Sequence, residues 1–221
     1  MIKAVIFDFD GVLVESADIK TLAFRKLFSR WPDKIDEILE YHIENMGISR
    51  YVKFRHFYEN ILREEYSETA GEELARQFSE IVVDEIKAAP IVKGTEKFLK
   101  QNCDNYLLFI ASGTPQKELE DIASFKQITV YFKEIYGSPN AKADVVEKIL
   151  KDYSLEKYQA VLVGDADSDR RAAQRAGIPF VARINNENSF LYKEKWKIND
   201  LTELTDIINE LNKIVESSNQ K

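Results

Sequence analysis

The chain has 221 residues, enough to bury a sizeable core in one or two domains. Its net charge of -7 argues against a nucleic-acid-binding protein, because such a protein needs a basic face. No apolar run is long enough to span a bilayer, and the first residues contain no long apolar signal region. We therefore expect a cytoplasmic protein, a monomer or a homodimer, with no membrane or nucleic-acid partner.

The first apolar run, residues 3–7, predicts a buried strand and leads into the letters DFDG at 8–11. Because strand residues alternate in direction, Asp8 and Asp10 point to the same side if the strand continues. Open α/β sheets bind ligands at the carboxyl ends of their strands, and Gly11 allows the chain to turn away at once. The motif is also a fragment of a calcium loop, but the position after Gly11 is apolar where that loop needs a ligand.

Residues 16–89 contain helix-like patterns and no predicted strand. Apolar residues recur at helical spacing in four stretches: Ile19-Leu22-Ala23-Leu27, Ile35-Ile38-Leu39, Tyr51-Phe54-Tyr58-Ile61-Leu62 and Leu74-Phe78-Ile81-Val82. We interpret the aromatic stripe as core and not as a ligand site. The sequence thus predicts a helical cap domain, 16–89, inserted into a core of residues 1–15 and 90–221, with hinges at 15–16 and 90–94.

A second apolar run, 106–110, predicts a strand that leads into Ala-Ser-Gly-Thr at 111–114, ahead of a helix-like stretch at 114–125. A hydroxyl and free backbone N–H groups before a helix form an anion site, although Ser-Gly-Thr alone is a common turn. Lys142 follows in a loop, before a helix-like stretch at 144–151. A single loop lysine is usually solvated, so its interpretation depends on the residues that accompany it.

A third run, 160–163, predicts a strand that leads into GDADSD at 164–169. This motif also begins like a calcium loop, but Arg170 replaces the required glycine and Ala176 the closing glutamate. Two acidic clusters at strand ends are better explained as parts of one site at a shared edge. Magnesium prefers a few carboxylates together with waters and phosphate oxygens.

The last predicted elements are a helix at 170–176, with Gly177 where a helix C-terminus favours glycine, and a strand at 179–182. Strands that alternate with helices indicate an α/β fold with a Rossmann-like parallel sheet as its core. The polar tail, 217–221, is expected to fray.

Taken together, these motifs resemble those of the haloacid dehalogenase-like superfamily. DFDGV, a strand-end serine, a lysine before a helix and GDxxxD occur in one order, and the resemblance spans essentially the whole chain. The helical insert is similar to that superfamily's type 1 cap. The chain looks most like phosphoglycolate phosphatases and β-phosphoglucomutase-like phosphatases. The resemblance implies a magnesium-dependent phosphatase that hydrolyses a small phosphorylated metabolite through an aspartyl-phosphate.

The resemblance also implies roles for the residues that match the motifs. Asp8 fills the position of the nucleophile that attacks phosphorus. Asp10 fills that of the acid that protonates the leaving oxygen and then activates water, which requires a pKa near the working pH. Ser112 matches the phosphate-binding hydroxyl, with Gly113 and Gly11 beside the phosphate.

Lys142 matches the lysine that neutralises phosphate and nucleophile. Asp165 matches the metal-binding acid, which acts together with Asp8 and the backbone carbonyl of Asp10. Asp169 matches a more distal acid, which either binds the metal directly or orients a ligand or Lys142. Asp167 has no implied role. Two positions depart from many relatives, because alanine replaces proline after Lys142 and replaces serine or threonine at position 166. Neither change removes a reacting atom.

Two cap positions bear on the substrate. The run Gly-Ile-Ser-Arg at 47–50 resembles a cap loop of β-phosphoglucomutases and related phosphatases, in which the arginine binds the part of the substrate that is not transferred. Arg50 matches that arginine, although Ser49 as an N-cap with a solvated Arg50 is the plain alternative. Lys20 stands where the mutases carry a histidine, which favours hydrolysis over mutase chemistry and makes Lys20 a second candidate substrate ligand.

Three alternatives to a phosphatase remain at the level of sequence. A phosphosugar mutase would use the same residues. A haloacid dehalogenase would attack carbon and lacks the second acid, so Asp10 argues against it. A non-catalytic binding module on this fold is the third, since fold alone does not establish activity; the intact set of reacting residues argues against it.

Overall fold

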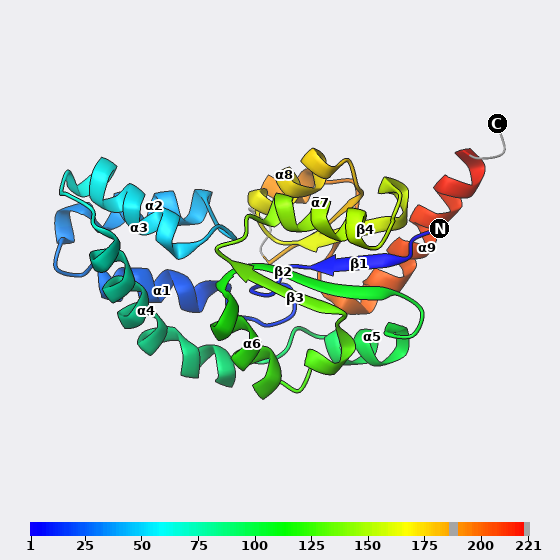
Figure 1. Cartoon of the computed structure of the whole chain (residues 1–221), viewed down its shortest axis with the longest axis horizontal. Coiled ribbons are helices and arrows are strands. Elements are labelled where there is room, and N and C mark those ends of the chain that lie inside the picture. The colour runs from blue at the N-terminus through cyan, green and yellow to red at the C-terminus, as the bar shows by residue number, and fades with distance from the viewer. Residues whose placement is uncertain (186–189, 219–221) are drawn as a thin grey trace.

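The computed structural model describes residues 1–185 and 190–218, and its centre is a six-stranded sheet in the order β3-β2-β1-β4-β5-β6. The strands are β1 (Ala4–Phe7), β2 (Leu107–Pro115), β3 (Glu134–Ser138), β4 (Ala160–Gly164), β5 (Phe180–Arg183) and β6 (Lys197–Ile198). Every neighbouring pair is parallel, with Ala4 opposite both Leu107 and Ala160. The predicted α/β fold with a Rossmann-like parallel sheet is confirmed (Figure 1).

The two edge strands, β3 and β6, are those that the apolar runs did not predict. β3 has the sequence EIYGS and is only half-buried over its first three residues, and β6 consists of two residues. An edge strand is covered less completely than an interior one, so it needs no continuous hydrophobic run. The four predicted strands are the interior strands of the sheet.

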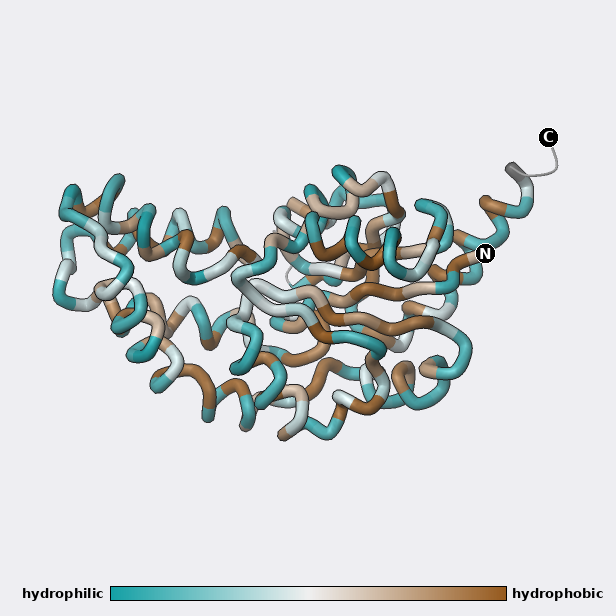
Figure 2. The backbone as a smooth tube through the Cα atoms, viewed as in Figure 1, coloured by the Kyte–Doolittle hydropathy of each residue, from teal (hydrophilic) through white to brown (hydrophobic). Residues whose placement is uncertain are grey.

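Helices cover both faces of the sheet. On one face lie α7 (Lys142–Asp152) and α8 (Asp167–Ala176), and on the other α5 (Thr95–Asn102), α6 (Gln116–Phe125) and α9 (Leu204–Ser218). Because successive strand residues point to opposite faces, Ile6 packs in the first layer and Phe7 in the second. Figure 2 shows the strands as the hydrophobic interior between largely hydrophilic outer turns.

A group of helices between β1 and β2 lies beyond the carboxyl ends of the strands (Figure 1). It consists of α1 (Ala17–Leu27), α2 (Ile35–Glu44), α3 (Arg50–His56) and α4 (Glu68–Ala88), with a 3-10 turn at Pro32–Lys34 and a π-helix at Phe57–Leu62. All four apolar stretches of the sequence lie on these helices. Phe54 and Phe78 are fully buried between them, as expected of core residues.

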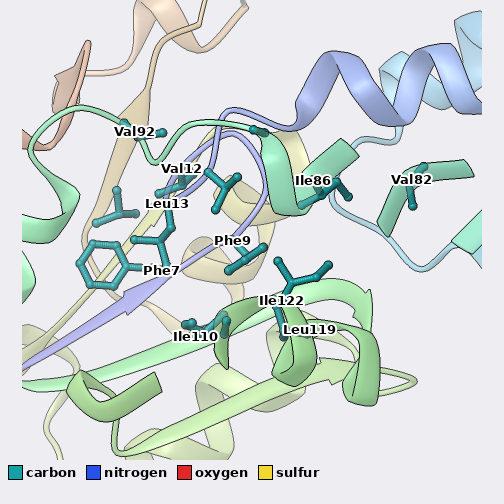
Figure 3. Packing of buried hydrophobic residues seen from close by; sticks show 14 of the residues in the cluster. Phe7, Phe9, Val12, Leu13, Val82, Ile86, Val92, Ile110, Leu119 and Ile122 are labelled. Carbon is teal, nitrogen blue, oxygen red and sulfur yellow. The ribbon is translucent and has the colours of Figure 1, made fainter. Parts of the chain in front are cut away.

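The two chain segments that join these helices to the sheet lie side by side. The N–H of Glu15 donates to the carbonyl of Pro90 (3.0 Å), and Val14 pairs with Ile91 in an antiparallel bridge. One hydrophobic cluster continues across the junction from Phe9 to α4 (Figure 3). None of the helices in residues 1–185 and 190–218 is long and apolar enough to cross a membrane.

Several helix starts differ from the sequence-based expectation. β2 continues to Pro115, which still pairs with Ser138, so the helix predicted from residue 114 begins at Gln116. Lys142 is the first residue of α7 and does not lie in a loop, and α8 begins at Asp167. Gly177 ends α8 in the left-handed conformation, as predicted. Of the tail expected to fray, residues 219–221 lie outside the described part of the chain.

Candidate active site

A pocket lies where the carboxyl ends of the interior strands meet the helical insert. Part of this pocket, between the sheet and the insert, is continuous with solvent. The residues with an expected role that line it are Asp8, Asp10, Lys20, Arg50, Ser112, Gly113 and Asp165. Lys142 and Asp169 are not among the lining residues, but Lys142 contacts both Asp8 and Asp169.

Asp8 comes directly after β1 and is 2% exposed. Its N–H donates to the carbonyl of Val163 on β4 (2.9 Å), which continues the ladder, and its Oδ1 accepts from the N–H of Phe9 (2.7 Å). Burial raises the pKa of Asp8 to about 7, although Lys142 opposes the rise. The carboxylate is therefore held in place, and further positive charge nearby would favour its ionised, nucleophilic form.

Lys142 bridges two buried carboxylates from the first turn of α7. Its Nζ lies 3.0 Å from Oδ2 of Asp8 and also pairs with Oδ1 of Asp169. The other oxygen of Asp169 accepts from the N–H of Ala166 (3.0 Å), so this carboxylate is fixed at both ends. Burial lowers the pKa of Lys142, but Asp169 and Asp8 outweigh it, and the pKa lies above its ordinary value. Lys142 is thus a permanent positive charge beside Asp8.

Asp8, Asp165 and Asp169 each offer a carboxylate oxygen, and the three oxygens lie within 4.8 Å of one another. The pKa of Asp165 is raised well above its ordinary value, first by burial and then by the charges of Asp8 and Asp169. Lys142 is one cation against three carboxylates, so the cluster is short of positive charge. A hard divalent cation with oxygen ligands fits this donor set and would remove that repulsion.

Asp10 does not belong to this cluster, because its carboxylate is held by three other side chains. Oδ2 accepts from Nζ of Lys20 (2.5 Å) and from Oγ1 of Thr114 (2.8 Å), and Oδ1 accepts from Oγ of Ser16 (2.7 Å). Burial opposes ionisation, but Lys20 and the hydroxyl donors outweigh it and hold the pKa of Asp10 below its ordinary value. Lys20, expected to bind substrate, therefore orients Asp10 in this structure.

Three residues were expected beside the phosphate, and two of them, Ser112 and Gly113, line the pocket whereas Gly11 does not. Ser112 is also buried. The N–H of Gly11 donates to the carbonyl of Val14 (2.8 Å). With φ of 73°, a side chain at position 11 would be strained, and its Cβ would lie 2.0 Å from Oδ2 of Asp165. The glycine makes room for Asp165, and its contact with phosphate stays a prediction.

The loop at 45–49, between α2 and α3, lies directly over the strand ends. The carbonyl of Met46 accepts from Oγ of Ser168 (2.8 Å), and a Cβ on Gly113 would lie 2.6 Å from the carbonyl oxygen of Gly47. A Cβ on Gly47 itself would lie 2.3 Å from Oγ of Ser168, and with φ of 78° a side chain there would also be strained, so this position requires glycine. The insert is closed over the pocket in this structure.

Arg50 is 4% exposed, so the alternative of a solvated arginine is wrong. Ser49 occupies the N-cap position of α3, but its side chain makes no capping hydrogen bond. The guanidinium group of Arg50 forms a two-pronged ion pair with Glu118 on α6 (3.0 and 2.6 Å) and donates to Ser79 (2.8 Å). Arg50 thus connects the insert to the sheet domain, and its contact with substrate stays a prediction.

Sequence reasoning missed five side chains of this site: Ser16, His42, Lys53, Thr114 and Asn185. Thr114 and Ser16 hold Asp10, and Nδ2 of Asn185 donates to Oδ2 of Asp165 (2.7 Å). Asn185 lies two residues after the end of β5, so its polar side chain near a strand end was an available signal. Lys53 had a signal too, since it lies three residues after Arg50 on the buried side of α3.

Comparison with known proteins places the chain in a family. The haloacid dehalogenase-like hydrolase family matches residues 5–183. The chain is 26% identical over 182 residues to a phosphoglycolate phosphatase of Aquifex aeolicus, covering 79% of this chain and 81% of the relative. It is 26% identical over 187 residues to a phosphorylated carbohydrates phosphatase of Thermotoga maritima, covering 80% and 82%.

Among solved structures, a β-phosphoglucomutase of Clostridium difficile superposes with a TM-score of 0.78 at 22% identity, covering 97% of this chain and 99% of that one. At 22% identity, this similarity shows a shared fold and carries no conclusion about activity. The family match covers most of the chain and contains the four motifs that carried the resemblance. The predicted enzyme class is confirmed, and the chain belongs to the haloacid dehalogenase-like hydrolase family.

Proposed function

We propose that the protein is a magnesium-dependent phosphatase that hydrolyses a small phosphomonoester through an aspartyl-phosphate on Asp8. The observation that carries this proposal is the placement of Asp8 in a pocket beneath the helical insert, with Lys142 at 3.0 Å, Asp165 in the same acidic cluster, and Asp10 lining the same pocket. The phosphatase names of the two relatives support the same activity.

In the first step, an oxygen of Asp8 attacks phosphorus, and the bond from phosphorus to the leaving oxygen breaks. Asp10 gives its proton to that oxygen, so the alcohol leaves neutral. Ser112 and the N–H of Gly113 hold the phosphoryl oxygens, and Lys142 offsets their charge. Phosphoryl transfer depends mainly on such positioning and electrostatic stabilisation.

In the second step, Asp10 removes a proton from water, and the water oxygen attacks the phosphorus of the aspartyl-phosphate. The acyl-phosphate bond breaks, inorganic phosphate leaves and the carboxylate of Asp8 is restored. Lys20 and Thr114 favour the ionised form of Asp10, which is the form that accepts the proton. Because these contacts also oppose the protonated form, we expect them to loosen when substrate brings its own charges into the pocket.

Asp8, Asp165 and Asp169 would hold the magnesium ion, together with the backbone carbonyl of Asp10. The ion supplies positive charge that allows an anionic nucleophile to approach an anionic phosphate. Asn185 orients Asp165, and Lys142 together with the N–H of Ala166 fixes Asp169.

We assign the helices in residues 16–89 to a cap that closes over the substrate and excludes water, with residues 15–16 and 90–94 as its hinges. The two connecting segments lie side by side, so the cap can rotate about both without breaking the sheet. The loop at 45–49 forms the roof of the pocket, and the ion pair between Arg50 and Glu118 stabilises the closed position.

Removal of divalent cations is expected to abolish phosphate release, and magnesium is expected to restore it. Magnesium at about 100 times its dissociation constant should also stabilise the fold by roughly 3 kcal/mol. Thermal unfolding and phosphate release, each measured with chelator and with magnesium, test both effects. Asp165→Asn should lose the magnesium response. Asp167→Asn should keep it, because Asp167 pairs with Arg170 and Arg171 instead of joining the cluster.

The experiment that tests the proposed function is a screen of phosphorylated metabolites for phosphate release with magnesium. The account expects free phosphate from a small phosphomonoester. A phosphomutase is the second candidate, and it would convert β-glucose 1-phosphate to an isomeric ester while releasing little phosphate. Product analysis on that sugar phosphate distinguishes the two, and a chain that turns over no ester under these conditions would contradict both.

A further inference from the structure

The cap end of the pocket contains a basic group that the proposed reaction does not use. Lys53 lies on α3 and His42 on α2, and both line the pocket although each is only 3% exposed. Phe24 and Phe78 complete this end, with Nζ of Lys53 lying 5.4 Å from the ring centre of Phe24. A lysine enclosed by aromatic and aliphatic side chains is rare unless a counter-charge is close.

Lys53 has no anionic partner among residues 1–185 and 190–218. Its Nζ contacts Nδ1 of His42 (2.8 Å) and the carbonyl oxygen of His42 (3.4 Å), and no described carboxylate forms an ion pair with it. Arg50, three residues earlier, differs because Glu118 and Ser79 occupy its terminal nitrogens. Two acceptors leave one N–H of the Lys53 ammonium group without a protein partner in the described chain.

The contacts of His42 indicate that it serves as a neutral acceptor for Lys53. Burial, followed by the charges of Lys53 and Lys20, lowers the pKa of His42 to about 2. In the neutral ring, Nδ1 accepts from Lys53, and Nε2–H donates to Oγ1 of Thr21 (3.0 Å). His42 thus orients the ammonium group and supplies no negative charge.

We propose that Lys53 is a specificity-determining residue whose ammonium group binds an anionic oxygen on the part of the substrate that is not transferred. The substrate class is then a short phosphomonoester with a second anionic group, either a carboxylate or a second phosphate. This inference depends on the proposed phosphatase function. It moves the substrate-reading role expected of Arg50 to Lys53, because Arg50 is engaged with Glu118.

Burial explains why such a ligand is needed. Together with the positive charges of Lys20 and Arg50, it lowers the pKa of Lys53 to about 7, although Asp10 acts in the opposite direction. An anion from the substrate supplies the missing counter-charge, and substrates that lack one leave the ammonium group buried and unpaired. A buried polar group that needs a partner distinguishes substrates with the second anion from those without it more strongly than an apolar surface would.

The test compares kcat and KM for four esters with magnesium: phosphoglycolate, ethylene glycol bisphosphate, hydroxyethyl phosphate and p-nitrophenyl phosphate. The first two carry the second anion as a carboxylate or a phosphate, and hydroxyethyl phosphate is the neutral counterpart of similar length. The parent should prefer at least one of the anionic pair over hydroxyethyl phosphate by roughly 10- to 100-fold in kcat/KM. The better of the two identifies which anion the site binds.

Lys53→Met, which keeps the length of the side chain but removes its charge, should lose this preference through KM. Its activity on hydroxyethyl phosphate and p-nitrophenyl phosphate should remain. Lys53→Arg should retain part of the preference. The matched control is Lys26→Met, since Lys26 is an exposed cap lysine on α1 away from this pocket. Circular dichroism and thermal unfolding check that each variant is folded.

A parent without the preference, a Lys53→Met variant that keeps it, or an equal loss on all four esters would overturn the inference. In the first two cases, release from p-nitrophenyl phosphate would still leave the phosphatase function standing. If the parent releases phosphate from none of these four esters but does so from another screened metabolite, the inference fails and the phosphatase function stands. If it releases phosphate from no ester at all, both fail.

Discussion

Asp8→Asn is expected to lower phosphate release by roughly 1000-fold or more, because the amide cannot form the aspartyl-phosphate on which both steps depend. The substitution keeps the shape of the side chain and the hydrogen bond that its oxygen accepts from the N–H of Phe9. Residual positioning by Ser112 and Lys142 cannot replace a missing nucleophile. Steady-state phosphate release, with Asp167→Asn as the control, measures the effect.

The same variant should be more stable than the parent in the absence of magnesium. The pKa of Asp8 rises from 3.8 to about 7 on folding, so the folded protein holds a proton there that the unfolded chain has already lost. Stability of the parent therefore falls as the pH rises from about 4 to 7, and Asp8→Asn removes this contribution. We expect a gain of roughly 1–3 kcal/mol at pH 7 and none at pH 4, measured by urea unfolding with chelator.

If Asp8→Asn is inactive and shows this pH-dependent gain in stability, it is folded, and its loss of activity comes from the missing nucleophile. A variant that keeps activity within about tenfold of the parent would show that Asp8 is not the nucleophile. A variant that is less stable than the parent at pH 7 would contradict the argument that the carboxylate is destabilised by burial.

Lys142→Met is expected to damage both stability and activity. It leaves Asp8, Asp165 and Asp169 without their cation, and losing one partner of a buried ion pair costs about 3–5 kcal/mol. The penalty should grow as the pH rises and the carboxylates ionise. Magnesium should restore part of the stability, since it supplies positive charge to the same cluster.

Activity of Lys142→Met should fall by roughly 100-fold or more even with magnesium bound, because the charge that Lys142 directs at the phosphate is lost. Lys148→Met is the matched control. Lys148 lies on the same helix but forms an exposed pair with Asp152, which contributes at most about 1 kcal/mol. Equal effects of the two substitutions on activity would contradict the role given to Lys142.

The sequence predicted the parts of the fold that are coded by strong local patterns. Strands buried on both faces carry continuous apolar runs, so β1, β2, β4 and β5 were evident, whereas the edge strands β3 and β6 were not. The position of Lys142 was predicted in a loop because residue 142 precedes an apolar pattern. The first residue of a helix is determined by backbone hydrogen bonds, and the spacing of apolar residues does not indicate where those bonds begin.

The sequence also indicated which side chains would meet, but not what each of them would contact. Acidic residues after two strands pointed to one cluster, since parallel strands end at a common edge. The pairing of Lys20 with Asp10 and of Arg50 with Glu118 depends on how the helical insert sits over the sheet. Lys53 and His42 meet because α2 and α3 pack against each other, and no motif reports that contact.

The most direct test of the central claim is to trap the phosphorylated enzyme. Rapid acid quenching during turnover, followed by mass spectrometry of peptides, locates any transferred phosphoryl group. The account predicts a phosphoryl group on Asp8 that disappears as the ester is consumed and does not form in Asp8→Asn. A phosphoryl group on another residue, or turnover at full rate without any phosphorylated enzyme, would contradict it.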